Sequence, residues 1–189
     1  MAVIFICMAT SSWIQSSGGQ VAVSKIVLPT QNGQSLAATL FKPISATSDT
    51  PAPFVAVVPG FQRSREALSN IAIELSRRGF VVVSIDPYGQ GSSSSSMSTR
   101  SATYEGYGMF ALIDYVFETD NLNYVDKSRI GATGHSAGGN AAIRGAAYFG
   151  KEASETDSAL SKLHSVYISG YVLTSVSYTH LTLPTTLLV

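Results

Sequence analysis

The sequence predicts an α/β protein with a mainly parallel, doubly wound sheet and an antiparallel start. From about residue 54, short apolar runs of strand length alternate with stretches of helical periodicity, the order typical of a parallel sheet covered by helices. The chain is also 45% hydrophobic and only 13% charged, which suits strands that are buried on both faces. Its 189 residues are enough for one domain with a sizeable core.

Charge balance and cysteine content argue against several classes of function. Twelve basic and twelve acidic residues cancel, and no basic stripe is present, so we expect no nucleic-acid partner. Cys7 is the single cysteine, which excludes an internal disulfide. No cluster of Cys and His favours a zinc or iron–sulfur site. We therefore expect neither a metal nor a cofactor.

Residues 1–20 leave two interpretations open. Residues 1–9 are apolar, but they are too short to span a bilayer and lack a basic start. They are either the remnant of a signal peptide or membrane anchor, or a buried first strand. Residues 16–20 are predicted to be a flexible joint. The first interpretation implies membrane association through the N-terminus and slightly favours a location outside the cytoplasm or at a membrane.

The domain is predicted to begin with a hairpin. Residues 21–28 alternate in polarity, Asn32-Gly33 is a strong turn signal, and residues 35–41 return as a second strand. The continuous apolar run 54–58 is typical of a central parallel strand. An antiparallel pair therefore precedes the parallel part of the predicted sheet.

Two helix–strand units continue the pattern. A helix is predicted to begin at Ser64 and to end at Gly79, with apolar residues at helical spacing between them. Residues 80–85 are predicted to be a buried strand, and the apolar positions within 109–117 predict the next helix. The serine run 92–96 between these two elements is interpreted as a mobile loop.

The pentapeptide Gly134-His135-Ser136-Ala137-Gly138 is the most informative stretch, because it fits the pattern G-x-S-x-G. An apolar strand precedes it and a helix of small residues follows it, so we expect a sharp turn that holds Ser136 at positive φ. A side chain on either glycine would collide with the neighbouring strand or helix. The helix N-terminus would direct partial positive charge toward an oxyanion. Ser136 is therefore the candidate nucleophile, and a further strand is predicted over 165–173.

With two upstream segments, this pentapeptide resembles the α/β-hydrolase superfamily over about residues 21–174. The segments are Val57-Val58-Pro59-Gly60-Phe61 and Asp86-Pro87-Tyr88-Gly89-Gln90-Gly91-Ser92, each directly after a predicted strand. Within the superfamily the chain is most similar to bacterial dienelactone-hydrolase-like and acetylxylan-esterase-like proteins, and more loosely to polyester-cleaving cutinase-like enzymes. Dienelactone hydrolases carry cysteine and dehalogenases aspartate where this chain has Ser136, so the serine favours ester cleavage.

This resemblance implies a carboxylic-ester hydrolase that works through an acyl-enzyme on Ser136. The backbone N–H groups of Phe61 (or Gln62) and Ala137 would form the oxyanion hole. The substrate would be a small-molecule or polymer-linked ester. Two alternatives stay open: a prolyl-oligopeptidase-like serine peptidase, which shares the serine turn, and a non-catalytic hydrolase-like binding module.

The catalytic acid and histidine that follow the serine in this fold are not recognised in the sequence. His164 directly precedes a predicted strand, at the end of the sheet away from the catalytic face. His180 lies in a tail, residues 176–185, that resembles a translated transposon-type sequencing adapter. We therefore expect residues 21–175 to be the N-terminal portion of a hydrolase domain without its C-terminal strands, and residues 176–189 to be non-native. Only residual catalysis is expected without the base.

Charged residues near the predicted loops are expected to be structural. Asp86 ends a strand but precedes Ser136 in the chain, so we expect it to cap a turn rather than to act as the catalytic acid. Arg63 and Arg65 are expected to be solvated, with a pairing to Glu66, although cations at a helix start are mildly unfavourable.

Three ring side chains belong to the segments that carry the resemblance. Phe61 and Tyr88 follow strand ends, where an aromatic residue lines the acyl pocket or belongs to the core. His135 occupies the variable position of the pentapeptide, and its neighbour Ser136 turns the opposite way. We expect His135 to pack or to hydrogen-bond structurally.

Overall fold

The computed structural model describes residues 1–30, 33–95, 106–149 and 165–169. The strands in this part of the chain are β1 (Val21–Pro29), β2 (Ser35–Pro43), β3 (Ala52–Val58), β4 (Val81–Ile85), β5 (Val125–His135) and β6 (Ser165–Ser169). They form one mixed six-stranded sheet in the order β1-β2-β4-β3-β5-β6. The predicted fold class, a mainly parallel sheet with an antiparallel start, is confirmed.

The antiparallel start is the hairpin of β1 and β2. Val21 lies opposite Pro43 and Pro29 lies opposite Ser35, which leaves a short connection that contains Gly33. Gly33 has φ +72°, as a tight turn requires, whereas Asn32 lies outside the described residues. β2 then pairs antiparallel with β4, while β4, β3, β5 and β6 pair in parallel.

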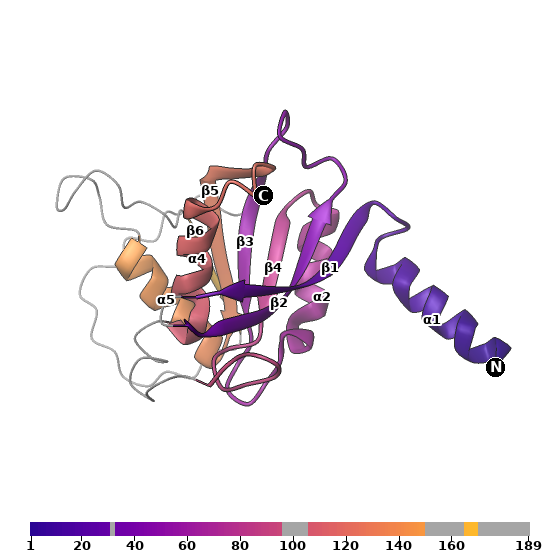
Figure 1. Ribbon diagram of the computed structural model, residues 1–189, viewed down its shortest axis with the longest axis horizontal. Coiled ribbons are helices and arrows are strands. Elements are labelled where there is room, and N and C mark those ends of the chain that lie inside the picture. Colours follow the sequence, from indigo (N-terminus) through magenta and orange to yellow (C-terminus); the bar gives the residue numbers. More distant parts are fainter. Residues whose placement is uncertain (31–32, 96–105, 150–164, 170–189) are drawn as a thin grey trace.

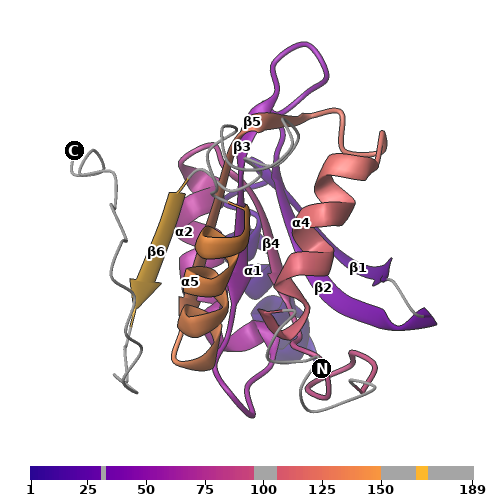
Figure 2. The same cartoon turned by 90° about the vertical axis from the view of Figure 1, so that its left-hand side faces the viewer.

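Helices cover both faces of the sheet (Figure 1; Figure 2). α4 (Met109–Glu118) and α5 (Ala137–Phe149) share one face, and α2 (Ser69–Arg77) covers the other. Alternate side chains of β3 pack against the helices on opposite faces of the sheet, because successive strand residues point to opposite faces. Phe54 and Ala56 belong to the core with α4 and α5, and Val57 packs with α2.

The helix predicted from Ser64 consists of two segments. A single 3-10 turn, η2 (Arg65–Leu68), precedes α2, and Ser64 is its extended N-cap residue, without a side-chain bond to the helix backbone. Gly79 ends the unit with φ +91°, the left-handed conformation typical of a helix end. The other predicted helix is confirmed as α4, which follows the 3-10 turn η3 (Gly106–Gly108).

The N-terminal residues form a helix, α1 (Ala2–Gln15), none of whose residues is buried. The interpretation of residues 1–9 as a buried first strand is wrong, because an uninterrupted apolar run without glycine or proline satisfies its backbone hydrogen bonds within a helix equally well. α1 projects away from the sheet (Figure 1) and exposes Phe5, Ile6 and Trp13. Within the described ranges, no helix combines the length and apolar character needed to cross a lipid bilayer.

Candidate active site

Ser136 occupies a strained turn between β5 and α5. Its φ is +54°, a conformation that residues other than glycine rarely adopt. A Cβ on Gly138 would overlap the carbonyl oxygen of Val58, and a Cβ on Gly134 would overlap the backbone of Gly138. Both flanking positions therefore accept only glycine, and the turn geometry predicted from the sequence is confirmed.

The helix after the turn approaches the sheet closely because its first turns carry small residues. Ala141 and Ala142 are fully buried and belong to the core that α4 and α5 share. The amide of Asn140 donates to the carbonyl of Ser136 over 3.1 Å, which closes the first turn of α5. The N-terminus of α5 thus begins directly at the serine, where the helix dipole stabilises negative charge.

The loop after β3 lies against the serine turn. β3 and β5 pair in parallel with Val58 opposite Gly134, so both strands end at the same level of the sheet. As a result, a Cβ on Gly60 would lie 3.2 Å from Cβ of Ser136. Phe61, the next residue, is 67% exposed. The structure therefore brings the loop residue before Phe61 against Ser136, while the role of the Phe61 amide stays a prediction.

Two other ring residues differ in environment. Tyr88 is 6% exposed and belongs to the core, so of the two predicted alternatives the core is the right one. His135 is exposed, with Nδ1 3.3 Å from a Cβ built on Gly60. His135 thus lies at the surface beside Gly60, and the expectation that it packs or hydrogen-bonds structurally stays a prediction.

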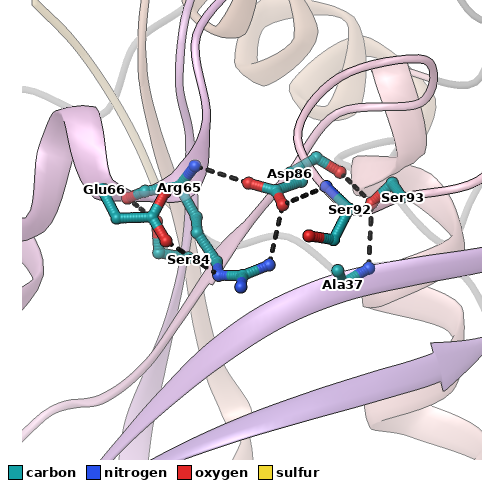
Figure 3. Close-up of polar contacts among 7 residues, drawn as sticks. All are labelled: Ala37, Arg65, Glu66, Ser84, Asp86, Ser92 and Ser93. Carbon is teal, nitrogen blue, oxygen red and sulfur yellow. Dashed lines mark hydrogen bonds and ion pairs between the residues drawn. The ribbon is translucent and has the colours of Figure 1, made fainter.

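The loop after β4 is organised by the buried carboxylate of Asp86, which is 1% exposed. Its Oδ1 accepts the amide of Arg65 at 2.7 Å, and its Oδ2 accepts Nη1 of Arg65 at 2.7 Å and the amide of Ser92 at 2.8 Å (Figure 3). Asp86 is therefore a structural anchor, in line with the expected capping role. A Cβ on Gly91, which has φ +54°, would overlap this carboxylate.

Arg65 corrects a sequence prediction. It is 9% exposed rather than solvated, and its main partner is Asp86, 21 positions along the chain. The carboxylate of Glu66, the expected partner, is more distant, with Oε1 3.4 Å from Nε of Arg65. The Ser64 hydroxyl, which hydrogen-bonds the Glu66 carboxylate, lowers the pKa of Glu66. Arg63 remains exposed, as predicted.

The serine run is not a free loop in its described part, residues 92–95. Ser93 Oγ donates to the carbonyl of Asp86 at 2.6 Å and accepts the amide of Ala37 at 2.9 Å. Ser94 Oγ accepts the amide of Ser35 at 3.0 Å. The mobile-loop prediction is therefore wrong here, because β2 extends past the end of its ladder with β4 and the serine hydroxyls pair with its remaining amides.

Neither histidine that follows Ser136 in the chain is placed. His164 and His180 lie outside the described residues, so their assignments stay predictions. In the part of the chain that the structure describes, no three side chains of His, Cys, Asp or Glu come together as a metal ion would require. The described residues at the carboxyl end of the sheet thus provide a strained serine, a helix N-terminus and two adjacent loops.

The sheet order and the strand–serine–helix turn define a member of the α/β-hydrolase superfamily. Within it, the chain belongs to the PET hydrolase-like family, whose model matches residues 7–160. The resemblance to ester hydrolases drawn from the three sequence motifs is confirmed at the level of the superfamily.

Solved structures with the same fold include an esterase, Pf2001, of Pyrococcus furiosus (20% identity, TM-score 0.55, covering 69% of this chain and 48% of that one). A hypothetical protein of Pseudomonas aeruginosa is also similar (23% identity, TM-score 0.60, covering 79% of this chain and 42% of that one). The α/β-hydrolase GrgF of Penicillium sp. sh18 is similar as well (22% identity, TM-score 0.51, covering 64% of this chain and 39% of that one). This chain spans less than half the length of each, and at these identities the likeness concerns the fold.

Proposed function

We propose that the protein is a serine hydrolase that cleaves carboxylic esters, with Ser136 as the nucleophile. The observation that carries this proposal is the positive φ of Ser136, +54°, in a turn whose flanking glycines admit no side chain. A strain of this kind persists only where the surroundings enforce it, and it is found mostly at functional sites. Membership of the PET hydrolase-like family supports the same conclusion.

The proposed reaction begins with attack of Ser136 Oγ on the ester carbonyl carbon. The carbonyl oxygen becomes an oxyanion, which accepts hydrogen bonds from the amides of Ala137 and Phe61. The tetrahedral intermediate collapses, the alcohol leaves with a proton, and an acyl-enzyme forms on Ser136. Water then releases the carboxylic acid. Loss of one oxyanion donor in such a site costs about 3 kcal/mol of transition-state stabilisation.

The base that takes the Ser136 proton is not assigned among the described residues. We therefore expect the 189-residue chain to hydrolyse esters slowly, because Ser136 attacks without the help of a base and only the oxyanion hole and substrate binding assist it. The substrate class is a small-molecule or polymer-linked ester, and the exposed Phe61 would be among the first side chains that an acyl group meets.

The test is hydrolysis of p-nitrophenyl acetate by the parent chain and by Ser136→Ala. We expect the rate of Ser136→Ala to fall below that of the parent chain, to what the oxyanion hole and substrate binding provide without a nucleophile, whereas the matched variant Ser45→Ala, which removes a hydroxyl from an exposed loop, keeps the parent rate. Equal rates in all three proteins would remove Ser136 from the mechanism and favour a binding module. Faster release from a proline p-nitroanilide than from the ester would favour a peptidase.

A further inference from the structure

The loop that carries Phe61 has little to hold it in place by itself. Phe61, Gln62 and Arg63 are all exposed, so no buried apolar side chain anchors the segment between Gly60 and Ser64. Gln62 has φ +58°, a conformation that costs about 1 kcal/mol or more for a residue with a side chain. An exposed loop with a strained residue relaxes unless its surroundings prevent it.

The structure fixes the C-terminal end of this loop at Arg65. The Arg65 amide and guanidinium both donate to Asp86, each at 2.7 Å, and all of these groups are buried. The Arg65 carbonyl accepts the hydroxyl of Ser84 at 3.0 Å. Arg65 is thus bonded through its amide, its carbonyl and its side chain to β4 and the residue after it (Figure 3).

A second bond holds the middle of the loop. The amide of Arg63 donates to Oε1 of Gln90 at 2.9 Å and lies 3.2 Å from the carbonyl of Gly60. Gln90 belongs to the same loop as Asp86, and the Ser92 amide on Asp86 fixes that loop in turn. Two loops that follow neighbouring strands are therefore connected by the side chains of Asp86 and Gln90.

The geometry points to Asp86, Arg65 and Gln90 as positioning residues, which hold the Gly60–Ser64 loop so that the amide of Phe61 faces Ser136. We refer to these three residues as the clamp. Its effect on catalysis rests on the proposed function, because only there does the Phe61 amide act on an oxyanion. The clamp does not contribute a catalytic acid, since both oxygens of Asp86 are engaged by N–H donors.

The expected consequence is specific to the transition state. An amide that meets the oxyanion contributes more when charge develops than when the substrate merely binds. Displacement of the Phe61 amide should therefore lower kcat and leave KM nearly unchanged. A displacement of about 1 Å can lower the rate by up to about a hundredfold.

The first experiment measures the mobility of the loop directly, by ¹⁵N relaxation of the backbone amides in the full chain. In the parent protein we expect order parameters near about 0.85 for the Phe61 and Gln62 amides, and values below about 0.6 in Asp86→Asn. Gln90→Leu, which leaves the buried pair intact, should lower them to a smaller extent. Asp126→Asn is the matched control, because it removes a partly exposed ion pair with Arg129, and it should leave these amides unchanged.

If the loop stays rigid in both Asp86→Asn and Gln90→Leu, the proposed positioning role of the clamp is wrong. If Asp86→Asn does not fold, Gln90→Leu alone decides, because Gln90 forms no part of the core. The second experiment compares kcat and KM for p-nitrophenyl acetate in the same variants, where a fall in kcat of about tenfold or more at constant KM is expected. A hydrolysis rate that is unchanged in Ser136→Ala would refute the proposed function, whereas the order parameters would still test the clamp.

Discussion

Two adjoining structures at the carboxyl end of the sheet are held by different forces. The serine turn, residues 134–138, depends on backbone approaching backbone, since a Cβ on Gly138 would overlap the carbonyl of Val58. The clamp depends on hydrogen bonds and charge, since Asp86 accepts three N–H groups in a buried environment. One structure requires the absence of side chains and the other requires particular ones.

The difference explains why one structure is visible in the sequence and the other is not. Steric exclusion requires glycine at fixed positions on either side of Ser136, and that spacing is local. The clamp joins Arg65 to Asp86 across 21 positions, and nothing local marks either residue as a partner of the other. This difference between steric exclusion and hydrogen bonding also means that the serine turn and the clamp respond differently to substitution.

The largest effect is expected for Gly138→Ala in the serine turn. The new methyl group would meet backbone atoms of β3, which cannot rotate away, so a loss of more than about 4 kcal/mol in the free energy of unfolding, or failure to fold, is expected. The matched control is Gly79→Ala, which has φ +91° but open space at its Cβ and should cost about 1 to 2 kcal/mol. Urea unfolding measures both. Similar midpoints for the two variants would contradict the backbone contact.

Asp86→Ala is expected to have the next largest effect. Removing one member of a buried ion pair leaves Arg65 with an uncompensated charge and costs about 3 to 5 kcal/mol. A second substitution, Arg65→Met, should cost less in the Asp86→Ala background than in the parent chain. Chemical unfolding of the four proteins gives this coupling. Additive losses would mean that the two side chains do not act as a pair.

Ser93→Ala tests the polar connection between the clamp and β2. It removes the hydroxyl that satisfies the amide of Ala37, and an unsatisfied amide of this kind costs about 1 to 3 kcal/mol. Ser92→Ala is the matched control, because Ser92 binds Asp86 through its backbone amide and should change stability by less than about 0.5 kcal/mol. Thermal unfolding distinguishes the two, and equal effects would show that the Ser93 hydroxyl is not the connection.

The smallest effect is expected at a partly exposed acid, Asp126, whose contacts contrast with those of Asp86. The Ser128 hydroxyl and Arg129 lower the pKa of Asp126 from 3.8 to about 2. A lowered pKa in the folded state stabilises the protein above the unfolded pKa, and this contribution is lost as pH falls from about 4 to about 2. Solvent screening limits it to about 1 kcal/mol or less.

Asp126→Asn measures this contribution. The difference in urea midpoint between the parent and the variant should be present at pH 6 and should shrink steadily below pH 4. A difference that is the same at pH 6 and pH 2.5 would show that the carboxylate charge has no role in stability.

Several parts of the fold and site were predictable because local physical chemistry determines them. Gly33 marks the hairpin and Gly79 marks a helix end because both require positive φ. The alternation of apolar runs with helical periodicity indicates the parallel sheet, since each pattern has its own repeat. Gly134, Ser136 and Gly138 predict the strained turn because no other residue type fits beside the serine.

The tertiary structure was needed wherever a residue depends on a distant partner. Arg65 looks like a solvated cation until the sheet brings it to Asp86, and the serines at 93 and 94 look flexible until β2 lies beside them with unpaired amides. Residues 1–9 have an apolar pattern that suits a strand or a helix, and only the folded chain shows a helix without buried residues. The physical reason is that a close backbone approach requires glycine at a fixed spacing, which the sequence displays whatever segment is approached, whereas hydrogen bonds and burial depend on which segments the sheet places side by side.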